Sequence, residues 1–127
     1  MPPEPAKELA SRVATDIVAG DVDDLYPLLH PVSRQSMTQQ QLTELLDKIE
    51  DFAGRPLEAT GKSRGTGTMT GTWGTRPVVK FWFDLRTTKA EPGEYVLQVD
   101  VVADDGEVSC SQFSVRTRLG ELAPGEK

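Results

Sequence analysis

The chain has 127 residues, of which 37% are hydrophobic and 27% charged, which is enough for one globular domain that needs neither a disulfide nor a metal to fold. The net charge of −6 argues against general nucleic-acid binding, and one cysteine and one histidine exclude an internal disulfide and a histidine-rich metal site. We expect no cofactor and no metal ion. No run reaches the roughly 20 apolar residues of a membrane-spanning helix, so we also expect no membrane span.

The start of the chain, residues 1–5, is rich in proline and lacks the basic and apolar regions of a signal peptide. Such a start can also be a linker that remains after an export signal was removed. We expect these residues to be flexible and the protein to be soluble. It is then in the cell envelope or secreted if a signal was trimmed, and in the cytoplasm otherwise.

Helical periodicity follows. From Ala6 to Val18 apolar side chains recur at the spacing of one helix face, and Gly20 is a natural stop. Asp21 can cap a short second helix, which His30-Pro31 ends. A third helix starts where Thr38 and Gln41 have the spacing of a capping box, and it closes at residue 54.

After residue 54 the pattern alternates as in strands. Residues 57–73 indicate a weak strand rich in Thr and Gly, and residues 78–86 and 95–102 indicate two stronger ones. Asp104-Asp105-Gly106 predicts a hairpin that leads to a last strand, and residues 120–127 are expected to be a loose tail. The sequence therefore predicts an α+β domain over residues 6–119. Three N-terminal helices would pack on a curved, mainly antiparallel sheet of about four strands, in a cone-like arrangement.

Motifs for catalysis are weak. Gly61-Lys62-Ser63 ends like a phosphate-binding loop, but Pro56 stands where that loop needs its first glycine. His30 is the natural general base near neutral pH, although a histidine before a proline is more typical of a helix cap. Cys110 has no evident base beside it, so we expect a structural thiol. Asp84 and Asp100 could form an acid–base pair, but cross-strand salt bridges explain them better.

The charge is unevenly distributed. Residues 55–89 carry seven basic and two acidic side chains, whereas the segments on either side are both acidic. Neutralisation between neighbouring strands is the simpler interpretation. An anion-binding face is the alternative. The basic residues of this segment are Arg55, Lys62, Arg64, Arg76, Lys80, Arg86 and Lys89.

Both faces of the strand at 78–86 are apolar. If Val79, Phe81, Phe83 and Leu85 face the helices, the opposite face exposes a cluster that is typical of a dimer interface. The opposite assignment would place Trp82 in a pocket beneath the helices, and the pattern leaves both open. The interface candidates are Val78, Lys80, Trp82, Val96, Gln98 and Val102.

Several short segments carry a family resemblance: Gly20-Asp21, Leu25-Tyr26-x-Leu28-Leu29, Phe52-x-Gly54, and Asp104-Asp105-Gly106-Glu107 followed by Phe113. With the order of elements, they resemble the nuclear transport factor 2-like superfamily of cystatin-like fold, and most closely its short bacterial domains of unknown function. Many relatives carry a tryptophan where this chain has Val108. Enzymatic members use Asp, His or Tyr inside the cone, and the nearest equivalents here lie in no recognisable catalytic motif. They are Tyr26, His30 and Asp84.

We therefore expect a non-enzymatic ligand- or protein-binding domain that forms a homodimer through its open sheet face, with no catalytic residues. One alternative is a small cone-pocket enzyme or carrier, isomerase- or cyclase-like, for an apolar ligand, with Tyr26, His30 and Trp73 at the mouth. Another is a partner-specific inhibitor or immunity-type protein whose acidic surface binds a basic protein.

Overall fold

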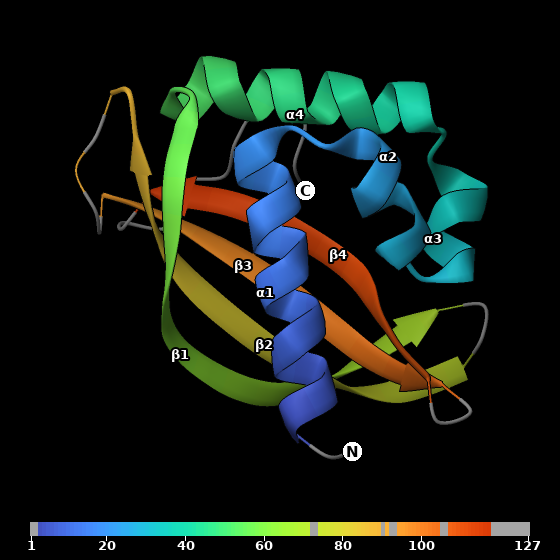
Figure 1. Ribbon diagram of the computed structural model, residues 1–127. Helices are drawn as coiled ribbons and strands as arrows, with labels where there is room; N and C mark the ends of the chain where they lie inside the picture. The colour runs from blue at the N-terminus through green and yellow to red at the C-terminus, as the bar shows by residue number, and fades with distance from the viewer. Residues whose placement is uncertain (1–2, 72–73, 90, 92–93, 105–106, 118–127) are drawn as a thin grey trace.

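A computed structural model describes residues 3–71, 74–89, 91, 94–104 and 107–117. Within this part of the chain, four α-helices and one short 3-10 helix precede a four-stranded antiparallel sheet, so the predicted α+β class is confirmed (Figure 1). The elements are α1 (Pro3–Ala19), α2 (Val22–Leu25), η1 (Tyr26–Leu28), α3 (Pro31–Ser36), α4 (Gln39–Ala53), β1 (Pro56–Gly71), β2 (Gly74–Thr87), β3 (Tyr95–Asp104) and β4 (Glu107–Thr117).

The helix caps follow the sequence closely. The Asp21 side chain accepts a hydrogen bond from the backbone N–H of Asp24 and starts α2. At α4 the capping box is complete, because Gln41 N donates to Thr38 Oγ1 at 3.1 Å and Thr38 N donates to Gln41 Oε1 at 2.8 Å. Both caps satisfy N–H groups that have no partner within the helix, and both predicted helix starts are confirmed.

Two helical features differ from the prediction. Helix α1 begins at Pro3, so residues 3–5, which we expected in a flexible start, are helical. Pro31 begins α3 rather than only ending the preceding turn. Proline is favoured in the first turn of a helix, where its missing N–H costs no hydrogen bond. The short helix α3 was therefore missed because its first residue resembled a stop signal.

The sheet is a simple meander in the order β1-β2-β3-β4. Strand β1 is long and strongly bent, and its pairing with β2 shifts register between Pro56 and Glu58 and again between Gly61 and Ser63. The second shift is a bulge-type irregularity, which bends a strand and increases its twist. This bend carries β1 around one side of α1 (Figure 1).

The core lies between α1 and the concave face of the sheet. Ala6 and Ala10 are fully buried on α1, and these small side chains let the helix pack closely on the strands. Phe81, Phe83 and Leu85 of β2 face this core, which decides between the two assignments that the sequence pattern left open. Much of the space beneath the helices is thus packed with side chains. The buried core residues are Ala6, Ala10, Val13, Ala14, Ile17, Leu25, Leu29, Leu42, Ile49, Ala53, Phe81, Phe83, Leu85, Leu97, Val99, Val101, Cys110, Phe113 and Val115.

Within the described ranges, none of the helices combines the length and the apolar character needed to cross a bilayer.

Candidate functional site

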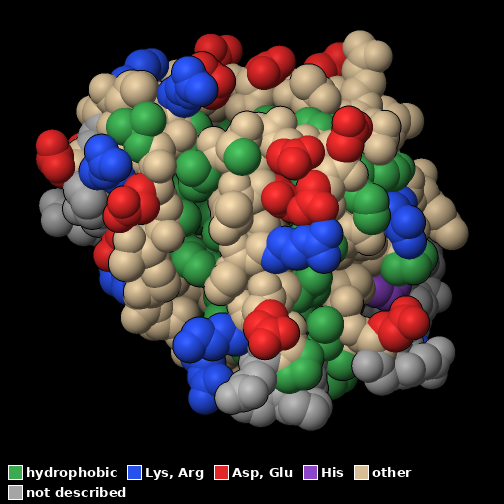
Figure 2. All heavy atoms as spheres, viewed as in Figure 1, with side chains coloured by type: hydrophobic (Ala, Val, Ile, Leu, Met, Phe, Trp, Pro, Cys, Tyr) green, Lys and Arg blue, Asp and Glu red, His purple; other side chains and the backbone are tan. Residues whose placement is uncertain are grey.

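A cleft of about 800 Å³ lies between α1 and β1, beside the packed core. Its volume falls in the range of small-molecule sites, roughly 300–1,000 Å³. Figure 2 shows hydrophobic side chains in the groove beside α1, with Lys or Arg side chains at its lower end. The lining residues are Lys7, Ser11, Ala14, Thr15, Val18, Glu58, Ala59, Gly61, Lys62, Ser63, Arg64, Phe81, Trp82 and Phe83.

The wall on α1 consists of small and aliphatic side chains with one lysine. Positions 7, 11, 14, 15 and 18 share one face because they recur at three- and four-residue intervals. Thr15 Oγ1 donates to the carbonyl oxygen of Ser11 at 2.9 Å, so this hydroxyl is satisfied within the helix. The small size of Ser11 and Ala14 leaves room for a ligand between the helix and the strand.

The wall on β1 is shaped by the irregularity between Gly61 and Ser63, which places Lys62 in the interrupted stretch. Gly65 lets the indole of Trp82 lie close to the strand, since a Cβ at position 65 would be only 3.1 Å from Trp82 Cη2. Trp82 Nε1 donates to Gln98 Oε1 at 3.3 Å, which fixes the other side of the ring. An aromatic surface therefore borders the cleft beside the bulge.

The cleft is cationic in an acidic chain. It is lined by three basic residues, Lys7, Lys62 and Arg64, and by one acid, Glu58. Lys62 Nζ lies 3.6 Å from Asp84 Oδ1, and Glu58 Oε2 lies 3.8 Å from Arg86 Nη2. Both are cross-strand pairs of the predicted kind, but they use the two acids of residues 55–89 themselves, so the excess of positive charge in this segment remains. Among the described residues, no ion pair is formed by Lys7 or Arg64, so their charges are available to a ligand.

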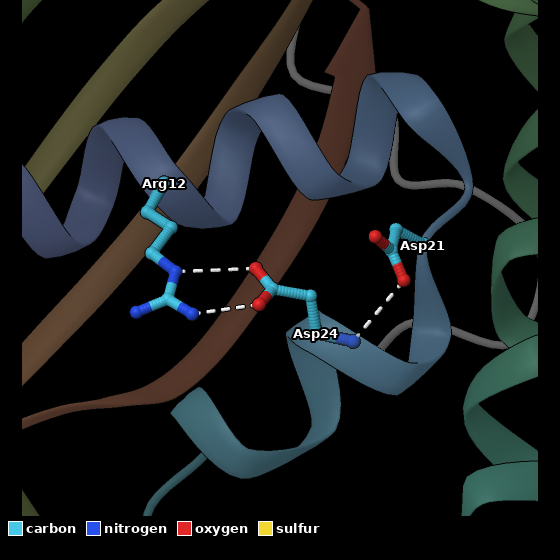
Figure 3. Close-up of polar contacts among 3 residues, drawn as sticks. All are labelled: Arg12, Asp21 and Asp24. Atoms are coloured by element: carbon cyan, nitrogen blue, oxygen red, sulfur yellow. Dashed lines mark hydrogen bonds and ion pairs between the residues drawn. The ribbon is translucent and has the colours of Figure 1, made fainter.

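A second charged cluster joins α1 to α2 and does not line the cleft (Figure 3). Arg12 forms a bidentate ion pair with Asp24, and this pair lowers the pKa of Asp24 to about 2. Asp16 is 7% exposed, and its buried Oδ2 has no donor in the structure. Burial, together with the neighbouring Asp24 and Asp21, raises the pKa of Asp16 to about 7. Within the described residues this cluster does not form a metal-binding group.

Two of the three predicted pocket residues, Tyr26 and His30, form hydrogen bonds with the backbone. The Tyr26 hydroxyl lies 2.8 Å from the carbonyl oxygen of Met37, to which it donates, and 3.1 Å from that of Arg34. His30 is buried and caps the start of α3, and its Nδ1 accepts from the backbone N–H of Val32 at 3.1 Å. Trp73 lies outside the described residues. Tyr26 and His30 thus hold the turn between η1 and α3, and beside His30 there is only a hollow of about 300 Å³.

The predicted interface on the convex face is less exposed than expected. Val78 and Val102 are direct cross-strand partners, and they are only 2% and 0% exposed. Gln98 is also buried, so three of the six candidates are covered within the chain, and Lys80, Trp82 and Val96 are half-buried. Gly67 contributes to this cover, because a Cβ there would meet Lys80 Cε at 3.3 Å. The expectation that all six residues form a solvent-facing cluster is therefore wrong. Homodimerisation stays a prediction.

The remaining candidates have structural partners. Asp84 pairs with Lys62, whereas Asp100 accepts from the side-chain amides of Gln98 and Gln112 at 2.9 and 2.8 Å. Three residue pairs of β2 and β3 lie between the positions of the two carboxylates, with Trp82 and Gln98 in the middle, so the carboxylates do not form an acid–base pair. Cys110 is buried and its thiol donates to the carbonyl oxygen of Gln112. Burial raises the pKa of this thiol, which agrees with a structural role.

Sequence reasoning missed the cleft because its walls come from α1 and β1, which are distant in the chain. The available signal was the basic, glycine-rich stretch around Gly61-Lys62-Ser63, which we excluded as a phosphate loop but which forms a bulge beside the cleft. Comparisons with family models, curated proteins and solved structures found no match to this chain.

Proposed function

We propose that the protein is a non-catalytic binding protein that holds a small organic molecule with an apolar body in the α1–β1 cleft. The observation that carries this proposal is the open volume of about 800 Å³ beside a core that is otherwise filled. Phe81 and Phe83 line its floor, and burying apolar ligand surface against such rings is favourable.

The side chains around the cleft favour binding over catalysis. The hydroxyl groups are those of Ser11, Thr15 and Ser63, and the one lining carboxylate, Glu58, is paired with Arg86. A nucleophilic hydroxyl needs a base within hydrogen-bond reach, and His30 is committed to capping α3 on another part of the molecule. The domain is thus non-enzymatic in this proposal, as expected from the sequence. Its ligand site is the α1–β1 cleft and not the predicted pocket at Tyr26, His30 and Trp73.

The membership in the nuclear transport factor 2-like superfamily also stays a proposal. It is supported by the order of elements, with helices preceding a curved meander sheet that bends around α1. The resemblance implies a pocket inside the cone, and three core residues that face α1 or the sheet, Ala14, Phe81 and Phe83, also line the α1–β1 cleft. We therefore base the ligand site on the cleft alone.

Binding of the neutral fluorescent dye Nile red tests the proposal. Thr15 is an exposed residue of the α1 wall, so Thr15→Trp fills the cleft without disturbing the core. We expect the variant to lose most of the dye affinity while its thermal unfolding stays close to that of the parent.

Thr43→Trp is the matched control for this experiment. Thr43 is also exposed on a helix and donates to the carbonyl oxygen four residues earlier, at 3.1 Å, but it lies on α4 outside the cleft. Dye affinity should be unchanged in this control. Equal affinities in the parent and both variants would show that the dye binds elsewhere and would contradict the proposal.

A further inference from the structure

We infer that the ligand of the α1–β1 cleft is an amphipathic organic anion, with a carboxylate or phosphate head group and an apolar body. This inference rests on the proposed function and specifies the class of molecule bound. It also gives one part of the basic central segment, Lys62 and Arg64, a role in anion binding together with Lys7 of α1.

The first argument is the local charge. The whole chain has a net charge of −6, yet the cleft is lined by three basic side chains and one acidic one. Lys62 is partly neutralised by Asp84, while Lys7 and Arg64 have no such partner among the described residues. A neutral ligand can only accept hydrogen bonds from these two cations, whereas an anion also gains the attraction between opposite charges.

The second argument is the arrangement of charge along the cleft. From Lys7 to Val18 the α1 wall is about 16 Å long, at 1.5 Å per residue. Figure 1 shows β1 starting near the carboxyl end of α1 and running toward its amino end. Along β1, Glu58 and Ala59 therefore come first, and Arg64 follows in the direction of the amino end, where α1 carries Lys7. The opposite end has Val18 and Ala59, with the acidic Glu58 beside them.

This polarity predicts the orientation of the ligand. The head group lies toward Lys7 and Arg64, where Ser11 and Ser63 can donate further hydrogen bonds. The apolar body extends over Phe81 and Phe83 toward Val18. Glu58 disfavours the reverse orientation, because it would place two negative charges together at the apolar end.

The experiment compares probes that share one alkyl chain: dodecanoate, dodecyl phosphate, dodecanol and dodecylamine, each below its micelle-forming concentration. Trp82 lines the cleft and the chain has two tryptophans, so Trp73→Phe leaves Trp82 as the single reporter for fluorescence titration. We expect the two anions to bind about tenfold more tightly than the alcohol, and the amine to bind most weakly. The affinities of dodecanoate and dodecyl phosphate then show which of the two head groups the cleft prefers.

Charge variants locate the head group. Lys7→Gln and Arg64→Gln should each weaken dodecanoate binding by about fivefold, as expected for solvent-accessible charge pairs, and leave dodecanol binding unchanged. Lys48→Gln and Arg34→Gln are matched controls, since both remove an exposed cation from a helix outside the cleft. They should leave all four affinities unchanged.

The outcomes separate this inference from the function on which it rests. If dodecanol binds as tightly as the anions, and Thr15→Trp abolishes both when binding is measured by titration calorimetry, the cleft is a site for neutral molecules and the anion inference is wrong. If none of the probes binds, or Thr15→Trp changes none of the affinities, the proposed function fails and the inference fails with it. Equal effects of Lys7→Gln and Lys48→Gln would also overturn the inference.

Discussion

Arg12 holds Asp24 at two points: its Nη2 lies 2.6 Å from Oδ1 and its Nε lies 3.1 Å from Oδ2, so the ion pair fastens α1 to α2 (Figure 3). The carboxyl group of Asp16 is part of the same junction, but it is buried, and the neighbouring Asp24 and Asp21 affect its pKa more than the charge of Arg12 does. The two aspartates are therefore shifted in opposite directions, with the pKa of Asp24 lowered to about 2 and that of Asp16 raised to about 7. A proton on Asp16 can be donated to Asp24, which gives the buried oxygen a hydrogen-bonded partner.

Asp16 should make the stability of the protein fall as the pH rises from about 4 to about 7. In the unfolded chain its pKa returns to 3.8, whereas the folded chain keeps the proton up to about pH 7. The folded state thus binds more protons in this range, and the free energy of unfolding decreases by about 2 to 4 kcal/mol across it. Asp16→Asn cannot ionise, so we expect a flatter profile and a more stable protein at pH 8, measured by urea denaturation at several pH values.

The control for this experiment is Asp23→Asn, which removes an exposed acid from the first turn of α2. The free energy of unfolding of this variant should change with pH as that of the parent does. If that of Asp16→Asn also changes in this way, then Asp16 is ionised in the folded protein at neutral pH and our assignment of its proton is wrong.

Arg12→Gln should act mainly on the pKa of Asp24. The two bonds from Arg12 are the largest cause of the low value, so the pKa of Asp24 should rise toward its ordinary 3.8 in the variant. NMR titration of the side-chain carboxyl groups measures this directly. Because both side chains are substantially exposed, at 57% and 35%, the loss in stability should be small and shrink at high salt. An unchanged titration of Asp24 would contradict the ion pair.

Much of the fold could be predicted because its signals are local. The cap at Asp21 and the capping box at Thr38 depend on residues three positions apart, and both have the predicted partners. The alternation of Phe81, Phe83 and Leu85 depends only on strand geometry, and it predicts that these side chains share one face, which the structure turns to the core. Such signals determine where an element begins and which of its residues lie on the same side.

The site could not be predicted in the same way because it depends on tertiary structure. Gly65 indicated a bend or close backbone approach, but the sequence did not show that Trp82 would be the neighbour. Likewise, Val78 and Val102 follow an outward-facing pattern and are nevertheless buried. Their exposure depends on the cross-strand pairing and on side chains such as Lys80, which periodicity cannot reveal.

Gly54→Ala should destabilise the protein by about 2 to 4 kcal/mol, from backbone strain and steric overlap. Gly54 ends α4 with a φ of +93°, and a Cβ at this position would lie 2.9 Å from Lys89 Cγ and 3.0 Å from the Lys89 backbone nitrogen. The backbone atom cannot move aside as a flexible side-chain end could. Thermal or urea unfolding measures the loss.

Gly20→Ala is the matched comparison for this loss. Gly20 also has a positive φ, of +70°, but a Cβ there would meet nothing within 4 Å. The cost should then be the strain alone, about 1 kcal/mol. Equal losses in the two variants would show that the contact with Lys89 is unimportant.

Cys110 should be nearly inert to thiol reagents in the folded protein. Its side chain is fully buried, and burial together with the negative charge of Asp100 raises the pKa of the thiol, so the reactive thiolate is scarce. At pH 8 we expect labelling on the order of a hundredfold slower than in urea-unfolded protein, since the reaction must await local opening. Rapid labelling of the folded protein would show that the β4 segment is accessible.

Gly65→Ala should displace the indole of Trp82 at the edge of the cleft. A Cβ at position 65 would lie 3.1 and 3.2 Å from Trp82 Cη2 and Cζ3, closer than ordinary contact, so the ring must shift by a few tenths of an ångström or the strand must move. We expect a loss of about 1 kcal/mol in stability and a changed Trp82 emission spectrum in the Trp73→Phe background.

Gly61→Ala separates this contact from the general effect of replacing a glycine of β1. Gly61 lies on the same strand, but a Cβ there would meet nothing within 4 Å. The substitution should leave the Trp82 spectrum unchanged and stabilise the protein slightly, because alanine has fewer conformations to lose on folding. If both variants change the emission spectrum alike, the spectrum reports any substitution in β1. The close packing on Gly65 would then not determine the position of Trp82. If only Gly65→Ala changes the spectrum, this glycine sets the place of the aromatic wall at which the ligand is proposed to bind.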